Sequence, residues 1–232
     1  MRLLPLALSL SLVVFAGCVP GPALRFEGAR PETATVLAGS VTMGAAYESE
    51  SDDSSDYDYG PGDTWGYAPP NVTFAAWWRW ALGGRVELST GTDIDLGYKN
   101  AASVGGGAKF LLTPPDGSDV HLAVSAAGGL TLFVYPGVAL AAWVDGGLPL
   151  TFDLTSTTAL TFRPSVRYGT PLTGWPDDQH YLFAGGSLAV RHPCGEGVAC
   201  VYELGVLALV HPLDDGSSQG LLDASFGVGA VF

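Results

Sequence analysis

Long stretches of this chain alternate between apolar residues and polar or small residues, and no other feature limits its possible folds as strongly. Successive residues of a β-strand point to opposite faces of a sheet, so a period of two predicts strands with one apolar face. The stretch 85–98, RVELSTGTDIDLGY, places valine, leucine and isoleucine on one face and glutamate, aspartate, serine and glycine on the other. The same pattern returns at 71–82, 158–168 and 220–232. No long apolar stripe at helical spacing follows residue 15, so we expect an all-β fold.

The alternation and the turn residues divide the chain into ten expected strands. The stretch 138–154 is long for one strand, and its DGG tripeptide could form a hairpin turn, so eight or twelve strands are the alternatives. An even number is expected when both ends of a barrel lie on the same side. The ten expected strands are 33–47, 71–82, 85–98, 102–113, 119–133, 138–154, 158–168, 181–191, 200–210 and 220–232.

Two architectures can be built from such strands, and the composition of the less apolar face distinguishes them. In a soluble sandwich that face meets water and should carry many long polar side chains. Here it consists mostly of glycine, alanine, serine and threonine, which suits the interior of a narrow closed barrel whose apolar face meets lipid. We therefore predict a single antiparallel transmembrane β-barrel. The alternative is a lipid-anchored soluble β-sandwich that binds a partner in the periplasm.

The charged residues of the strands support the barrel. Acidic and basic side chains occur in equal number on the face that we expect to point inward. Buried charges are stable only when they are paired, so a lumen of low dielectric needs such a balance. The basic residues are Arg79, Arg85, Lys109, Arg163, Arg167 and Arg191, and the acidic residues are Glu87, Asp93, Asp95, Asp153, Glu203 and Asp223.

The connections between strands differ in length, and their lengths predict an orientation. Short turns face the periplasm in such barrels, and GG at 83–84 and PPDGS at 114–118 are short. The longest connection lies within 48–70 and is therefore expected to be an acidic external loop. A solvated surface loop is favoured there over a calcium site, because the carboxylates lack the ordered spacing and glycine of a dedicated site. The carboxylates concerned are those of Asp52, Asp53, Asp56 and Asp58.

The chain begins with a secretory signal at residues 1–17, whose apolar run is too short to cross about 30 Å of hydrocarbon. The small residues before Cys18 resemble the lipobox of bacterial lipoproteins, which implies that the Cys18 thiol carries a diacylglycerol. Phe15 departs from that pattern, since the family usually has an aliphatic residue there. Ordinary cleavage after Ala16, leaving Cys18 as a free thiol, is the alternative. Val19 is not the aspartate that retains such lipoproteins in the inner membrane, so the resemblance implies the outer membrane.

The remaining cysteines, Cys194 and Cys200, are six positions apart in HPCGEGVACVY. An oxidising periplasm would allow them to close a small loop as a disulfide. The alternative is a metal site that uses His192 as a further ligand, but this set is thin and no second cluster accompanies it. We therefore expect a structural disulfide and no metal.

The last residues, DASFGVGAVF, form an alternating strand that ends on an aromatic side chain. They resemble the final strand of bacterial outer-membrane β-barrels, in which this strand is read by the barrel-assembly machinery. The resemblance implies that Phe226, Val228 and Phe232 form the assembly signal and that outer-membrane lipid surrounds the barrel. We accordingly divide the chain into the signal peptide 1–17, a lipid-anchored linker 18–31, and a barrel 32–232.

Little in the sequence indicates a reaction. The formal net charge of −13 argues against nucleic acid as a partner, and no motif calls for a cofactor. We predict a non-enzymatic envelope scaffold or a very narrow pore, because ten strands packed with paired charges leave little open channel. The alternative is a hydrolase at the outer rim that uses Asp177, Asp178 and His180, since an aspartate beside a histidine could activate water.

Overall fold

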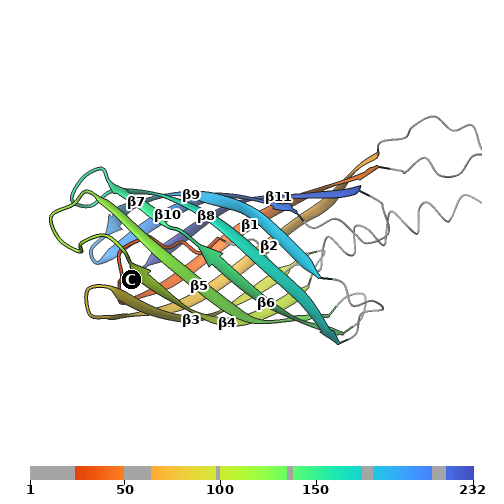
Figure 1. Cartoon of the computed structure of the whole chain (residues 1–232), viewed down its shortest axis with the longest axis horizontal. Helices are drawn as coiled ribbons and strands as arrows, with labels where there is room; N and C mark the ends of the chain where they lie inside the picture. Colours follow the sequence, from red (N-terminus) through yellow and green to blue (C-terminus); the bar gives the residue numbers. More distant parts are fainter. Residues whose placement is uncertain (1–23, 50–63, 98–99, 135–137, 174–179, 211–217) are drawn as a thin grey trace, which may run out of the picture.

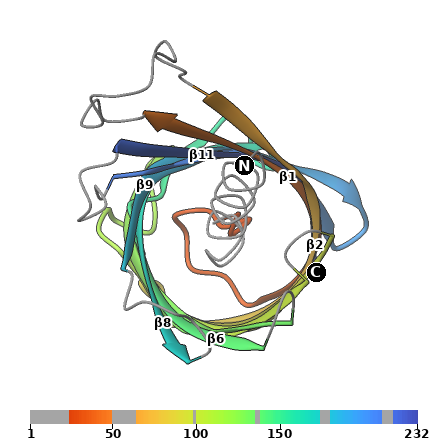
Figure 2. The same ribbon diagram turned by 90° about the vertical axis from the view of Figure 1, so that its right-hand side faces the viewer.

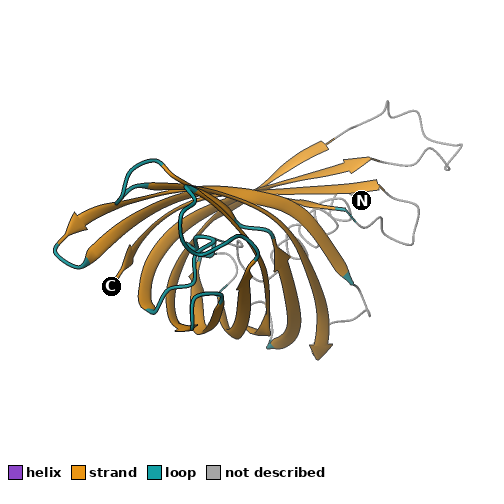
Figure 3. Ribbon diagram, turned by 60° about the vertical axis from the view of Figure 1, so that its left-hand side comes forward, coloured by secondary structure: helices purple, strands orange, loops and turns teal. Residues whose placement is uncertain are grey.

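The computed structural model describes residues 24–49, 64–97, 100–134, 138–173, 180–210 and 218–232, which form strands and connecting turns (Figures 1 and 3). None of these residues belongs to a helix long and apolar enough to cross a membrane. The strands are β1 (Ala34–Ser49), β2 (Thr64–Leu82), β3 (Val86–Leu96), β4 (Ala101–Leu111), β5 (Val120–Phe133), β6 (Ala139–Gly147), β7 (Leu150–Asp153), β8 (Ala159–Thr173), β9 (Tyr181–Gly195), β10 (Val198–Leu209) and β11 (Ser218–Val231).

The strands form one closed antiparallel barrel. Apart from β6 and β7, which do not pair with each other, each strand pairs with its neighbours in the chain, and β1 also pairs with β11, so the sheet has no free edge. The short strands β6 and β7 both lie between β5 and β8 and occupy one place in the sheet. The eleven strands therefore fill ten positions, which confirms the predicted count.

The interruption between β6 and β7 is centred on Pro149 and not on the DGG tripeptide. Proline has no N–H to donate and is confined in sheets to edges and irregularities. The neighbouring strands stay bonded across the break, because the Ala123 N–H donates to the Pro149 carbonyl at 3.0 Å and the Leu148 N–H donates to the Pro164 carbonyl at 3.0 Å. The hairpin at DGG, on which the alternative strand counts rested, is therefore not formed.

The last strand closes the barrel as far as the final residue. Val231 pairs with Val36, and the backbones of Phe232 and Thr35 exchange hydrogen bonds of 2.9 and 3.1 Å. The side chains of Phe226, Val228 and Phe232 lie on the outer face and are exposed, as the alternation predicted. Their role in assembly stays a prediction.

The two faces of the barrel differ in chemistry. Large apolar side chains cover the outside, and among them Phe74 and Leu204 are more than half exposed. The inside holds small residues and buried charges, of which Glu87 and Lys109 are each 2% exposed. A sandwich would bury the apolar face and expose the charges, so the sandwich alternative is wrong.

Four connections lie at the same end of the barrel as Phe232 and the start of β1, and we call this end the turn end (Figure 1). They connect β2 to β3, β4 to β5, β7 to β8 and β9 to β10. The β9–β10 turn is closed by a disulfide between Cys194 and Cys200, whose Cα atoms are 5.7 Å apart. The structure thus contains the predicted disulfide, in which the two thiols that the alternative metal site would use are bonded to each other.

Reducing this disulfide is expected to have a modest effect. A loop this short gains about 2 kcal/mol or less from chain entropy, and the hairpin backbone is already hydrogen bonded. We expect the C194S/C200S variant to fold in detergent, with its urea midpoint lowered slightly relative to the native chain under oxidising conditions. The two proteins should have equal midpoints in reductant, and a variant that no longer folds would contradict this account.

Several predicted features lie outside the described residues. They are the signal peptide 1–17, Cys18, most of the acidic loop 48–70, and the pair Asp177 and Asp178.

Candidate functional site

Residues 24–33, which we call the lumen segment, run inside the barrel before the chain turns into β1. Figure 2 looks along the barrel and shows this segment, in orange, within the ring of strands. Leu24, Phe26 and Ala29 are almost completely buried. Residues 18–31 were expected to form a linker between anchor and barrel, but residues 24–31 of that stretch lie in the lumen.

Ion pairs fix the acidic side chains of the lumen segment to the barrel wall. Glu32 receives a hydrogen bond from Arg79 of β2 at 2.9 Å, and it also pairs with Arg191 of β9. Glu27 pairs with Arg163 of β8 at 3.0 Å. The two glutamates thereby connect the segment to three separate strands.

The wall also satisfies the backbone of the lumen segment, which has no sheet partner of its own. The N–H groups of Phe26, Ala29 and Glu32 donate to Glu203 (2.7 Å), Thr151 (2.8 Å) and Glu87 (2.8 Å), respectively. Lys109 donates to the carbonyl of Gly28 at 2.8 Å. Buried backbone groups need such partners, so these inward side chains act as a template for the segment.

Arg30 forms a further anchor near the turn end of the lumen. Its Nε donates to Nε2 of His121 at 2.8 Å, and its Nη2 lies 2.7 Å from Asp153. Nε2 of His121 also lies 3.3 Å from Asp153, so Arg30, His121 and Asp153 form one cluster. His121 itself is fully buried.

Arg25 is held by aromatic rings. Its guanidinium carbon lies 4.6 Å from the ring centroid of Trp77 and 4.9 Å from that of Trp143. Both indoles point inward and are almost fully buried. These distances are typical of cation–π contacts.

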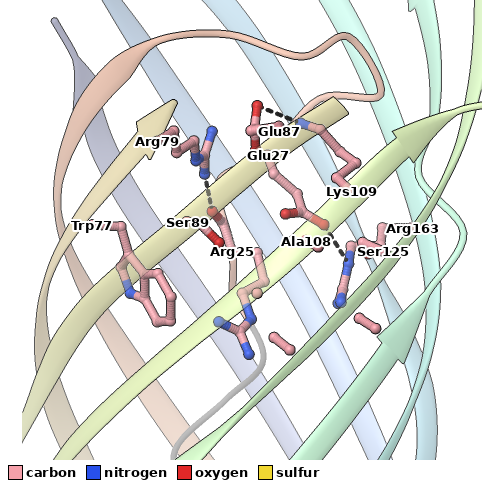
Figure 4. Close-up of a pocket in the computed structure, with 13 residues that line it drawn as sticks. Arg25, Glu27, Trp77, Arg79, Glu87, Ser89, Ala108, Lys109, Ser125 and Arg163 are labelled. Atoms are coloured by element: carbon pink, nitrogen blue, oxygen red, sulfur yellow. Dashed lines mark hydrogen bonds and ion pairs between the residues drawn. The ribbon is translucent and has the colours of Figure 1, made fainter. Parts of the chain in front are cut away.

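The wall charges pair with one another as well (Figure 4). Lys109 lies 2.9 Å from Glu87, and each side chain is 2% exposed. Arg163 pairs with Asp145, which also lies 3.6 Å from Arg167. Of the predicted lumen charges, the structure buries Arg79, Glu87, Asp95, Lys109, Arg163, Arg167, Glu203 and Asp223.

The other predicted lumen charges lie in different settings. Asp93 faces inward and accepts a hydrogen bond from the Trp77 indole at 2.8 Å. Asp153 and Arg191 are partly exposed towards the turn end. Arg85 is not a lumen charge, because it lies in the exposed β2–β3 turn, one position before β3 begins.

Asp145 and the four charged residues of the lumen segment were not among the predicted lumen charges. Asp145 belongs to the DGG tripeptide, which was weighed as a turn, although it alternates in phase with the inward residues Ala141 and Trp143. The lumen-segment charges are Arg25, Glu27, Arg30 and Glu32. Two positive and two negative charges within a short stretch of otherwise uncharged residues were the signal that could have indicated this site.

Little space remains around the lumen segment. The cavity beside Arg25 and Glu27 has a volume of about 20 Å³, which is room for about one water molecule (Figure 4). A wider vestibule of about 1020 Å³ opens at the turn end, and residues 26–28 and 30–34 form part of its lining. The segment therefore separates this vestibule from the deeper lumen.

Both glutamates of the lumen segment are stabilised in the ionised form. Burial alone would raise the pKa of Glu27, but Arg163, Lys109, Arg79 and Arg25 outweigh it and lower the pKa to about 2. Burial likewise opposes ionisation of Glu32, and Arg79 and Arg191 reverse that effect and lower its pKa. A carboxyl group whose pKa is depressed stabilises the docked segment above its ordinary pKa and loses that contribution in acid.

Acid is therefore expected to release the lumen segment. The contribution of Glu27 is complete above its ordinary pKa of 4.5 and disappears as the pH falls towards about 2. We expect conductance in planar bilayers to rise across this interval and to be constant from pH 5 to pH 7. The E27Q/E32Q variant should lack this dependence, and a conductance that rises already near pH 6 would contradict the assignment.

The remaining candidate residue, His180, lies at the rim opposite the turn end. It is exposed, and its Nδ1 is 2.6 Å from the Tyr168 hydroxyl, with the two rings stacked at 5.7 Å. Across the described residues, no group of three or more histidine, cysteine, aspartate or glutamate side chains could hold a metal ion.

A closed antiparallel barrel with an apolar exterior and a charged interior defines the class of transmembrane β-barrels. Comparison with solved structures finds barrels of the bacterial outer membrane. The NanC porin shares 10% identity over 84% of this chain and 98% of its own, with a TM-score of 0.43. An outer-membrane channel from Pseudomonas putida F1 shares 11% over 92% and 100%, with a TM-score of 0.45. The outer-membrane protease OmpT from Escherichia coli shares 9% over 93% and 98%, with a TM-score of 0.43.

No protein-family model matches the chain, and no curated protein matches it in sequence.

Proposed function

We propose that this protein is a non-enzymatic barrel of the bacterial outer membrane whose lumen is closed by its own residues 24–33. It serves as an envelope scaffold or as a very narrow pore that conducts only when the lumen segment moves. One observation carries this proposal. The lumen segment is bonded to inward side chains of β2, β3, β7, β8, β9 and β10, and a cavity of only about 20 Å³ remains beside it.

The proposal includes an orientation. The turn end faces the periplasm, and the acidic loop 48–70 is displayed outside the cell. Phe226, Val228 and Phe232 are read by the assembly machinery during insertion, and Cys18 carries the lipid. The disulfide and the C-terminus share the turn end, and the longest connection, between β1 and β2, leaves from the opposite end, which supports this orientation.

Catalysis at the rim is not part of this proposal. His180 is engaged by Tyr168 and is exposed, so its surroundings do not by themselves prepare it as a base. The H180A variant is expected to fold and behave as the native protein does. Loss of a hydrolytic activity towards an envelope lipid or peptide in that variant would support the hydrolase alternative instead.

The proposal is tested by folding the protein and measuring solute flux. The chain from residue 19 onward should give a heat-modifiable band on gels only when it is refolded with detergent micelles. Liposomes that contain the folded protein should not swell in small sugars. Folding without detergent would overturn the membrane barrel, and swelling that depends on sugar size would overturn the closed lumen.

A further inference from the structure

The two indoles that hold Arg25 belong to one row of residues that crosses five neighbouring strands. In direct register, Trp77 of β2 pairs with Gly91 of β3, Gly91 with Gly105 of β4, Gly105 with Gly129 of β5, and Gly129 with Trp143 of β6. All of these positions point into the lumen. The wall thus carries a tryptophan at each end of a floor made of three glycines.

The row leaves no room for larger side chains beside the indoles. A Cβ atom on Gly91 would lie 2.4 Å from Trp77, and Cβ atoms on Gly105 and Gly129 would lie 2.7 and 2.8 Å from Trp143. A Cβ atom on Gly129 would also lie 2.2 Å from the backbone carbonyl oxygen of Val104. Real atoms do not approach so closely, so a larger residue would displace the rings and, at Gly129, the neighbouring strand. The row is therefore built to lay two indoles flat along the wall, where they form a slot with aromatic sides.

The guanidinium of Arg25 is held in this slot mainly by the aromatic rings. It lies within 5 Å of both ring centroids, and its Nη2 atom is buried with no hydrogen-bond partner among the described residues. Nearby carboxylates favour a cation, because Asp93 and Asp145 both interact electrostatically with Arg25. Arg167, which lies 5.4 Å from the Trp143 ring, opposes them.

A planar cation with delocalised charge suits these contacts best. A guanidinium stacks on aromatic faces and is less strongly hydrated than an ammonium ion, so burial between two indoles costs it less. The contacts that define the slot involve only the guanidinium group of Arg25. A free cation of the same shape would meet the same rings and the same carboxylates.

We propose that the row from Trp77 to Trp143 is a binding slot for planar guanidinium-type cations, which Arg25 occupies as an internal ligand. The inference rests on the proposed function, since it requires the lumen segment to be a removable occupant. It goes further by naming the class of solute that a lumen freed of the segment would bind. A free guanidinium-type cation and the side chain of Arg25 therefore compete for the same slot.

The test measures tryptophan fluorescence of the mature protein, folded in detergent micelles, during titration with guanidinium or argininamide. The R25A variant empties the slot and should show a saturable change, with half-saturation on the order of 1 mM for two stacked contacts. The native protein should respond at least tenfold more weakly. Urea, which is planar but neutral, and sodium chloride at matched concentrations should produce no saturable change.

A second substitution locates the binding. R25A/W143L removes one side of the slot and retains Trp77 as a reporter, so its half-saturation should rise at least tenfold. If R25A does not fold, R25K keeps the positive charge without the planar group and should still bind guanidinium more tightly than the native protein does. A response that is equal for R25A and the native protein, equal for urea and guanidinium, or unchanged by W143L would overturn the slot. Liposome swelling tests the closed lumen separately, so the two proposals can fail independently.

Discussion

The E87A variant is expected to lose about 3–5 kcal/mol of unfolding free energy, because the substitution leaves a charge buried without its partner. Lys109 lies 2.9 Å from Glu87, and each side chain is 2% exposed. Glu87 also accepts the backbone N–H of Glu32 at 2.8 Å. Urea unfolding of the protein in micelles, followed by tryptophan fluorescence, measures the change.

Two companion variants separate this effect from a general effect of charge. D116A removes an acidic residue from the exposed β4–β5 turn and should change the unfolding free energy by less than about 0.5 kcal/mol. E87M/K109M replaces both members of the buried pair and should recover much of the loss, since neither partner is left charged and unpaired. If E87A were as stable as D116A, the buried pair would not have the role assigned to it.

The E27Q/E32Q variant is expected to open the lumen. It keeps the size of both side chains but removes the charges that face Arg163, Arg79 and Arg191. A glutamine can still accept a hydrogen bond, so each substitution loses only the difference between a charged and a neutral hydrogen bond, about 1 kcal/mol. Two such losses should increase the open population about 30-fold. Single-channel recording in planar bilayers measures this population.

The matched control is E196Q, which makes the same substitution in the exposed β9–β10 turn. Single-channel recordings of E196Q should resemble those of the native protein, with rare or no openings. The account would be contradicted if E27Q/E32Q folded normally and conducted no more than E196Q.

The barrel could be predicted from the sequence because alternation is a local property. The stretch 85–98 shows its apolar and charged faces without reference to any other strand, and the structure forms β3 within it. The interruption of the strand at Pro149 could not be predicted from the proline alone, because the neighbouring DGG tripeptide is also a turn signal. Whether a strand continues past an interruption depends on its pairing with the neighbouring strands, here β5 and β8. The local sequence does not encode that pairing.

The candidate site could not be predicted, because its contacts join residues that are far apart in the chain. Glu27 and Arg163 are separated by 136 positions, and their meeting depends on the segment entering the barrel. Alternation within residues 24–33 is confined to the four residues 24–27, so a short stretch of mixed charge was interpreted as a linker. The tryptophan slot depends on the register of five strands at once, and a shift of one residue would turn Trp77 outwards.

The position of the lumen segment is tested most directly by a disulfide trap in a C18S background. Ala29 of the segment and Ala123 of β5 belong to one buried cluster, so A29C/A123C should form an internal crosslink that mass spectrometry of the folded protein detects. The control A29C/V124C places the second cysteine on the outer face of the same strand and should not crosslink. A crosslink in the first variant alone is the predicted result. No crosslink in either, with the thiol introduced by A29C labelled freely by a membrane-impermeant reagent, would show that the lumen segment lies outside the barrel.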